Sequence, residues 1–129
     1  MARSDATPAA STAAQQAAVL TKATFRAAAL LGLSHAAVAR TIGVSPATAS
    51  RLASGERSLE IGTKPAELAA LLVRVYRSLD ALVGNSDQHR RAWMDSPNDA
   101  FGQAPRDAIR SVEGLALVVR YLDGARAPV

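Results

Sequence analysis

The side chains that could recognise another molecule gather between residues 35 and 58, which read HAAVARTIGVSPATASRLASGERS. This stretch contains three arginines, Arg40, Arg51 and Arg57, among serines and threonines. A guanidinium group can donate two hydrogen bonds to a guanine edge, and it can also pair with a phosphate. The combination therefore predicts a nucleic-acid contact rather than a catalytic centre.

The charge distribution supports the same prediction, because the formal net charge of +4 is confined to one segment of the chain. Between residues 22 and 58 the basic residues are Lys22, Arg26, Arg40, Arg51 and Arg57, and Glu56 is the only acidic one. A local basic patch is what a polyanion-binding surface requires. Chance clustering of these cations on a solvated helix face is the alternative interpretation.

The spacing of small and apolar residues in this segment predicts two short helices, over 35–42 and 46–54, joined by a tight turn. Ala39 is small enough for the helices to cross there, and Gly43 suits a turn position with positive φ. Ser45 can cap the second helix, and Pro46 suits its first position. The residues expected to face inward are Val38, Val44, Ala49 and Leu52. The pattern is typical of a helix-turn-helix, and a helical hairpin packed only for stability is the alternative.

In a helix-turn-helix the start of the second helix enters the major groove of DNA. The residues expected to face the bases are Ser45, Pro46, Ala47, Thr48, Ser50 and Arg51. Of these, only Arg51 can make a bidentate contact with guanine. Arg57 and Arg40, with Lys22 and Arg26, are expected at phosphates. Because the side chains are short, we expect one copy to bind DNA weakly and linked copies to bind usefully.

The composition predicts an all-α fold, and the order of the segments places an N-terminal helix-turn-helix bundle before a small C-terminal helical domain. Hydrophobic residues make up 49% of the chain but aromatic residues only 4%, and alanine and leucine dominate, which favours helices over sheet. We expect a flexible tail over 1–15, a DNA-binding domain over 16–60 and a second domain over 61–129. Further helices are expected over 16–31, 65–83, 86–95, 105–109 and 113–123.

Enzymatic chemistry is not expected. The chain has no cysteine, and its two histidines, His35 and His89, are far apart in sequence. It also lacks a glycine-rich phosphate loop, a carboxylate pair and a metal-spaced cluster, so no cofactor or metal is predicted. No apolar run is long enough to span a membrane, and we expect a soluble, cytoplasmic protein.

Two features of the C-terminal half concern packing. Between Pro65 and Gly84 leucines recur at helical spacing, and Val73 and Tyr76 lie off this stripe, which predicts a second buried face that another chain could cover.

Further on, the stretch WMDSPNDAFGQAP contains two of the five aromatic residues, Trp93 and Phe101, on either side of a turn. Burial of these rings is expected to fix an irregular loop.

The C-terminal half resembles the toxin-binding domain of the Xre/MbcA/ParS antitoxin family. The matching motifs are LDALVG (79–84), RRAWM (90–94), SPNDAFG (96–102), PRDAI (105–109), SVEG (111–114) and VVRYLDG (118–124). With the Xre-type helix-turn-helix, the resemblance spans residues 20–124 in the family's domain order. Met94 and Phe101 stand where family members often have leucine, and Gly102-Gln103 replaces a common double glycine. These differences put the exact path of the loop in doubt more than the resemblance itself.

The resemblance implies the antitoxin of a type II toxin-antitoxin system, which covers the active site of an NAD-consuming RES-domain toxin and represses its own promoter. It also implies a homodimer within a larger toxin-antitoxin complex, with the NAD chemistry residing in the toxin. The residues it places at the toxin are Arg106, Asp107, Arg110, Glu113, Arg120, Tyr121, Asp123, Arg126 and Val129. Because a cleft for NAD should be basic, the carboxylates of this set are candidate plugs. Alternatively, the last helix completes the core and its charges are solvated.

Two other functions remain open from the sequence. A stand-alone helix-turn-helix transcriptional regulator would use the C-terminal half for dimerisation or effector binding, and a RES-type reading frame beside the gene would argue against it. A pure interaction module would not shift promoter DNA in a gel.

Overall fold

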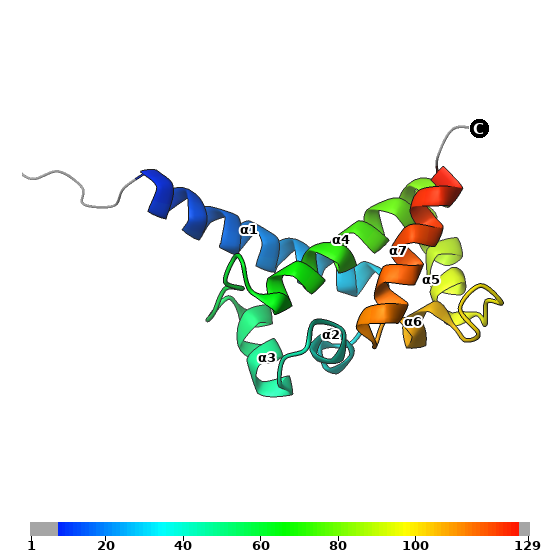
Figure 1. Cartoon of the computed structure of the whole chain (residues 1–129), viewed down its shortest axis with the longest axis horizontal. Helices are drawn as coiled ribbons and strands as arrows, with labels where there is room; N and C mark the ends of the chain where they lie inside the picture. Colours follow the sequence, from blue (N-terminus) through cyan, green and yellow to red (C-terminus); the bar gives the residue numbers. More distant parts are fainter. Residues whose placement is uncertain (1–7, 127–129) are drawn as a thin grey trace, which may run out of the picture.

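A computed structural model describes residues 8–126 and contains seven helices (Figure 1). They are α1 (Pro8–Leu30), α2 (His35–Ile42), α3 (Pro46–Ser54), α4 (Lys64–Leu82), α5 (Asp87–Asp95), α6 (Pro105–Ala108) and α7 (Val112–Arg126). The described part of the chain forms no strand, and its β-type pairing is a single bridge between Asn98 and Gln103. The predicted all-α class is therefore confirmed.

Helix α4 is the central element of the fold, because it packs against α1 on one side and against α7 on the other. Figure 1 shows α2 and α3 on one side of the pair formed by α1 and α4, and it shows α5 and α6 beside α7. The largest fully buried side chains come from both halves and belong to one cluster: Leu31, Ile42, Leu72, Leu79, Met94, Ile109, Leu115 and Leu122. The N-terminal and C-terminal halves thus share a single hydrophobic core.

The first helix begins earlier than predicted. Its start at Pro8 means that the expected tail is helical over 8–15 and that the predicted start at residue 16 was wrong. Proline is tolerated in the first turn of a helix, and alanine has the highest helix propensity, so the segment can be helical without a periodic apolar face. Residues 1–7 lie outside the described part of the chain.

The other helices lie close to their predicted bounds, because their ends carry strong local signals. Ser34, Ser45, Thr63 and Ser86 each accept a hydrogen bond from the backbone N–H three residues further on, at the starts of α2, α3, α4 and α5. Helix α7 continues three residues past its predicted end at residue 123, to Arg126.

The predicted second buried face of α4 is present. Val73 is buried, and Tyr76 is half-buried with the Arg90 guanidinium 5.7 Å above its ring. Tyr76 is therefore covered in part by the chain's own α5.

Candidate nucleic-acid and protein interfaces

The turn between α2 and α3 has the predicted helix-turn-helix geometry. Gly43 has a φ of 77°, and the backbone N–H groups of Gly43 and Val44 both donate to the Ala39 carbonyl, at 2.9 and 3.0 Å. The inward-facing side chains predicted in this unit, Val38, Ala49 and Leu52, are buried, and Val44 is half-buried. These positions fix the angle between the two helices, as expected for a DNA-reading pair.

The residues predicted to face the bases lie at the start of α3 and are exposed, except for the half-buried Thr48. Ser45 Oγ accepts a hydrogen bond from the Thr48 backbone N–H at 3.0 Å and donates one to Thr48 Oγ1 at 3.0 Å. The hydroxyls of Ser45 and Thr48 therefore serve the helix cap. Among the residues predicted to face the bases, Ser50 and Arg51 are the exposed polar ones that take no part in the helix cap.

The cations around α3 differ in their surroundings. Arg51 Nε lies 4.0 Å from Glu56 Oε2, and both side chains are largely exposed. A pair this long and this solvated is weak, so a phosphate or a base can replace it at little cost. Arg40 and Arg57 are exposed and form no ion pair within residues 8–126. The proximity of Glu56 to Arg51 was not predicted from the sequence.

In the C-terminal half, three aromatic rings hold the loop after α5 against α7. The ring centroids of Trp93 and Phe101 are 6.0 Å apart, and those of Phe101 and Tyr121 are 5.2 Å apart. The Asn98 carbonyl accepts hydrogen bonds from the N–H groups of Phe101 and Gly102 at 3.0 Å. Trp93 and Phe101 hold the loop as predicted, but their rings are half-buried rather than buried, and Tyr121 joins them while remaining 42% exposed.

The residues predicted at a protein partner have varied surroundings in the structure. Glu113 and Arg120 are exposed, and Arg110 pairs with Asp107 at 3.2 Å. Asp123 accepts hydrogen bonds from Arg74 Nη2 at 2.6 Å and from Ser78 Oγ at 3.4 Å.

Of the other residues predicted at a protein partner, Arg106 is bound within the chain, and Arg126 and Val129 cannot be described in the same way. Arg106 Nε donates to Asp95 Oδ1 at 2.6 Å, so this side chain, like Asp123, already has partners within the chain. The side chain of Arg126 and the whole of Val129 lie outside what the structure describes.

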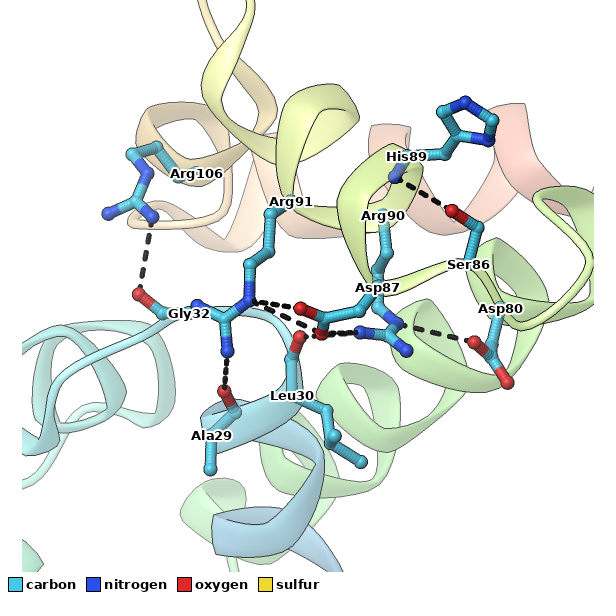
Figure 2. Close-up of polar contacts among 10 residues, drawn as sticks. All are labelled: Ala29, Leu30, Gly32, Asp80, Ser86, Asp87, His89, Arg90, Arg91 and Arg106. Atoms are coloured by element: carbon cyan, nitrogen blue, oxygen red, sulfur yellow. Dashed lines mark hydrogen bonds and ion pairs between the residues drawn. The ribbon is translucent and has the colours of Figure 1, made fainter.

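Three arginines join the two halves of the molecule through contacts that the sequence analysis did not predict (Figure 2). Arg90 Nη1 donates to the Leu30 carbonyl at 3.1 Å, Arg91 Nη2 to the Ala29 carbonyl at 3.3 Å, and Arg106 Nη2 to the Gly32 carbonyl at 3.2 Å. The carbonyls of Ala29 and Leu30 belong to the last turn of α1, and that of Gly32 lies just past it. Backbone acceptors at a helix C-terminus lack the usual helical partner four residues further on and carry partial negative charge. We call Arg90, Arg91 and Arg106 the arginine clamp.

Arg90 is the buried member of the clamp. It is 5% exposed, and besides the Leu30 carbonyl it contacts Asp87 Oδ1 at 2.6 Å and Asp80 Oδ1 at 3.2 Å. One signal in the sequence could have indicated this burial. Arg90, Trp93 and Met94 follow the i, i+3, i+4 spacing of one helix face, and Met94 is fully buried.

Arg90 and its partner Asp87 each stabilise the charged form of the other. Hydrogen bonds from Arg90, and then from Arg91, lower the pKa of Asp87 below its usual value of 3.8. Burial of Arg90 opposes its charged form, but the hydrogen bonds from its guanidinium to Asp87 and Asp80 outweigh this effect, and the pKa of Arg90 is raised. The carboxylates thus stabilise the buried cation that binds the end of α1.

The described residues lack two further kinds of feature. No three histidine, cysteine, aspartate or glutamate side chains in this part of the chain are grouped to hold a metal ion. None of the helices described is both long and apolar enough to cross a membrane.

Comparison with known protein families identifies two consecutive domains. Residues 11–74 match the antitoxin Xre-like helix-turn-helix domain, and residues 78–127 match the antitoxin Xre/MbcA/ParS C-terminal toxin-binding domain. No curated protein matches the chain. The first match contains the helix-turn-helix and the second contains the aromatic loop and α7, and the two meet within α4.

Proposed function

The chain belongs to the Xre-type antitoxins, and we propose that it neutralises an NAD-consuming RES-domain toxin by covering the toxin's active site. The observation that carries this proposal is the presence of both antitoxin domains in consecutive order, from residue 11 to residue 127. The antitoxin itself would supply no catalytic group. Its contribution is binding, to a toxin through one half and to promoter DNA through the other.

We propose that the toxin docks on the face formed by α6, the start of α7 and the exposed edge of Tyr121. Exposed or half-exposed carboxylates on this face, Asp107 and Glu113, would complement the basic lining that an NAD cleft requires. Arg110 and Arg120 extend the same exposed surface. Arg106 and Asp123 would hold this surface in place through their internal ion pairs, while Arg126 and Val129 remain proposed contacts.

The test of this proposal is coexpression with an adjacent RES-type reading frame. Cells expressing the toxin alone should stop growing, and cells expressing both proteins should grow. A chain that ends at Asp123 should rescue growth less well, because it lacks Arg126 and Val129. Full rescue by this shorter chain would remove both residues from the proposed contact, and no rescue by the complete chain would refute the proposal.

The DNA-binding half would repress the promoter of the toxin-antitoxin operon. We place the antitoxin in the cytoplasm, because it would bind both the promoter and the toxin in that compartment. Two associated copies would present two α3 helices to successive major grooves, which raises affinity by making the second contact intramolecular. This arrangement would compensate for the short side chains at the start of α3.

Replacing Arg51 with alanine is expected to weaken binding to the operon's promoter by about 10-fold to 100-fold and to reduce sequence preference, because a bidentate contact with guanine is lost. The measurement is a titration of promoter DNA and of scrambled DNA at fixed salt concentration. Arg120→Ala, which removes the same charge from an exposed position on α7, should leave both affinities nearly unchanged. Unaltered affinity and preference in the Arg51 variant would exclude α3 as the reading helix.

A further inference from the structure

Glu56 is the only acidic residue in the basic segment between residues 22 and 58, and it lies beside Arg51, the arginine proposed to read the bases. Arg40 and Arg57, which are expected at phosphates, have no carboxylate partner in the described part of the chain. The one carboxylate of the segment is therefore placed at the base-reading arginine and not at the arginines expected to bind phosphates.

The turn that follows α3 holds the backbone of Glu56 in place. The Arg51 carbonyl accepts hydrogen bonds from Ser54 Oγ at 3.0 Å and from the Arg57 backbone N–H at 3.2 Å. The Glu56 backbone N–H donates in turn to Ser54 Oγ at 3.4 Å. These bonds fold the chain back against the last turn of α3, which brings the side chain of Glu56 next to that of Arg51.

The contact between the two side chains is made at one edge of the guanidinium group. Glu56 Oε2 lies 4.0 Å from Nε of Arg51. Since a guanidinium has five N–H donors in one plane, a contact at Nε leaves both Nη nitrogens available. Two donors of this kind can bind O6 and N7 of one guanine. Arg51 can therefore contact guanine while Glu56 remains beside it.

A phosphate and a guanine respond differently to such a pair. Attraction to phosphates depends on net positive charge and carries no sequence information, whereas recognition of guanine depends on directed hydrogen bonds to uncharged acceptors. A carboxylate at Nε reduces the net charge that Arg51 presents to phosphates but leaves the donors that a guanine uses.

We propose that Glu56 is a positioning residue that makes Arg51 selective for bases over phosphates. The carboxylate orients the guanidinium with its Nη nitrogens outward, and it weakens binding to DNA of the wrong sequence. This inference rests on the proposed reading of promoter DNA by α3. Because both side chains are largely exposed, the contribution of the pair is modest, and the expected change is several-fold.

The test is a titration of the full chain with a DNA fragment from the operon's own promoter and with a scrambled fragment of the same length, at several salt concentrations. Glu56→Gln should raise the affinity for scrambled DNA about twofold to fivefold without raising the affinity for promoter DNA. The preference for the promoter should fall by the same factor. Affinity for scrambled DNA should also depend more steeply on salt, because Arg51 becomes a further phosphate contact.

A double-mutant cycle shows whether Glu56 acts through Arg51. In a chain that already carries Arg51→Ala, Glu56→Gln should leave the ratio of the two affinities unchanged. The matched control is Glu60→Gln, which removes the same charge from another exposed glutamate beyond α3 and should leave the preference intact. Circular dichroism should show that all variants are folded.

Three results would overturn the proposal: an unchanged preference in Glu56→Gln, an equal loss of preference when Arg51 is already alanine, or an equal loss in Glu60→Gln. Failure of the proposed base reading is a separate result, because it would appear as unaltered DNA binding by the Arg51→Ala variant alone.

Discussion

Replacing Arg90 with alanine is expected to lower the free energy of unfolding by about 3–5 kcal/mol, the largest effect of any single change considered for this chain. The guanidinium is buried and binds Asp80, Asp87 and the Leu30 carbonyl. Its removal leaves a helix-end carbonyl and the partly buried Asp80 without their partner. In thermal unfolding followed by circular dichroism, the midpoint should fall by about 10–15 °C.

Two further substitutions separate the contributions of charge and packing. Arg90→Met keeps most of the apolar stem but no donor, so it should destabilise the chain almost as much as alanine does. Arg91→Ala removes an arginine whose side chain is 48% exposed and should cost less than about 1 kcal/mol. A methionine variant as stable as the unaltered chain would show that the clamp does not stabilise the junction of the two halves.

Replacing Gly114 with alanine is expected to destabilise the junction of α6 and α7 by about 2 kcal/mol and to weaken toxin neutralisation while DNA binding is retained. A Cβ at this position would overlap the Ala108 carbonyl oxygen, and it would lie 2.7 Å from the carbonyl carbon. Since the obstacle is backbone, α6 and α7 must move apart. That movement would displace Asp107 and Glu113 in the proposed toxin face, whereas α3 packs mainly against α2 and α1.

The matched control is Gly124→Ala, because Gly124 lies in the same helix and a Cβ there would meet no atom within 4 Å. Alanine has a higher helix propensity than glycine, so this variant should be unchanged or more stable by up to about 1 kcal/mol. The measurements are thermal unfolding, toxin copurification and promoter binding. Equal behaviour of the two variants would contradict the assignment of tight backbone packing to Gly114.

The helix-turn-helix could be predicted almost residue by residue because its signals are local. Ser45 caps the helix that it directly precedes, and Gly43 supplies the positive φ of a turn within the same short segment. The anchoring of the aromatic loop was predictable for a similar reason, since Trp93 and Phe101 are close in sequence. In these cases each residue lies within about ten sequence positions of the helix end, turn or loop that it stabilises.

Features that depend on distant contacts were not predictable in this way. The arginine clamp exists only because the end of α1 meets α5 and α6, with Arg90 and Leu30 sixty positions apart. The internal partners of Asp123 depend in the same way on the packing of α7 against α4. The early start of α1 was missed for a different reason, because alanine propensity, rather than an apolar period, supports its first turns.

Inhibition of the toxin can be measured by titrating the purified RES-domain toxin encoded beside the gene with the purified full chain and following the consumption of NAD. NAD consumption should fall in proportion to added chain until the toxin is saturated, and the two proteins should elute together in gel filtration. Undiminished NAD consumption in a molar excess of folded chain, with the two proteins eluting separately, would contradict the proposed neutralisation.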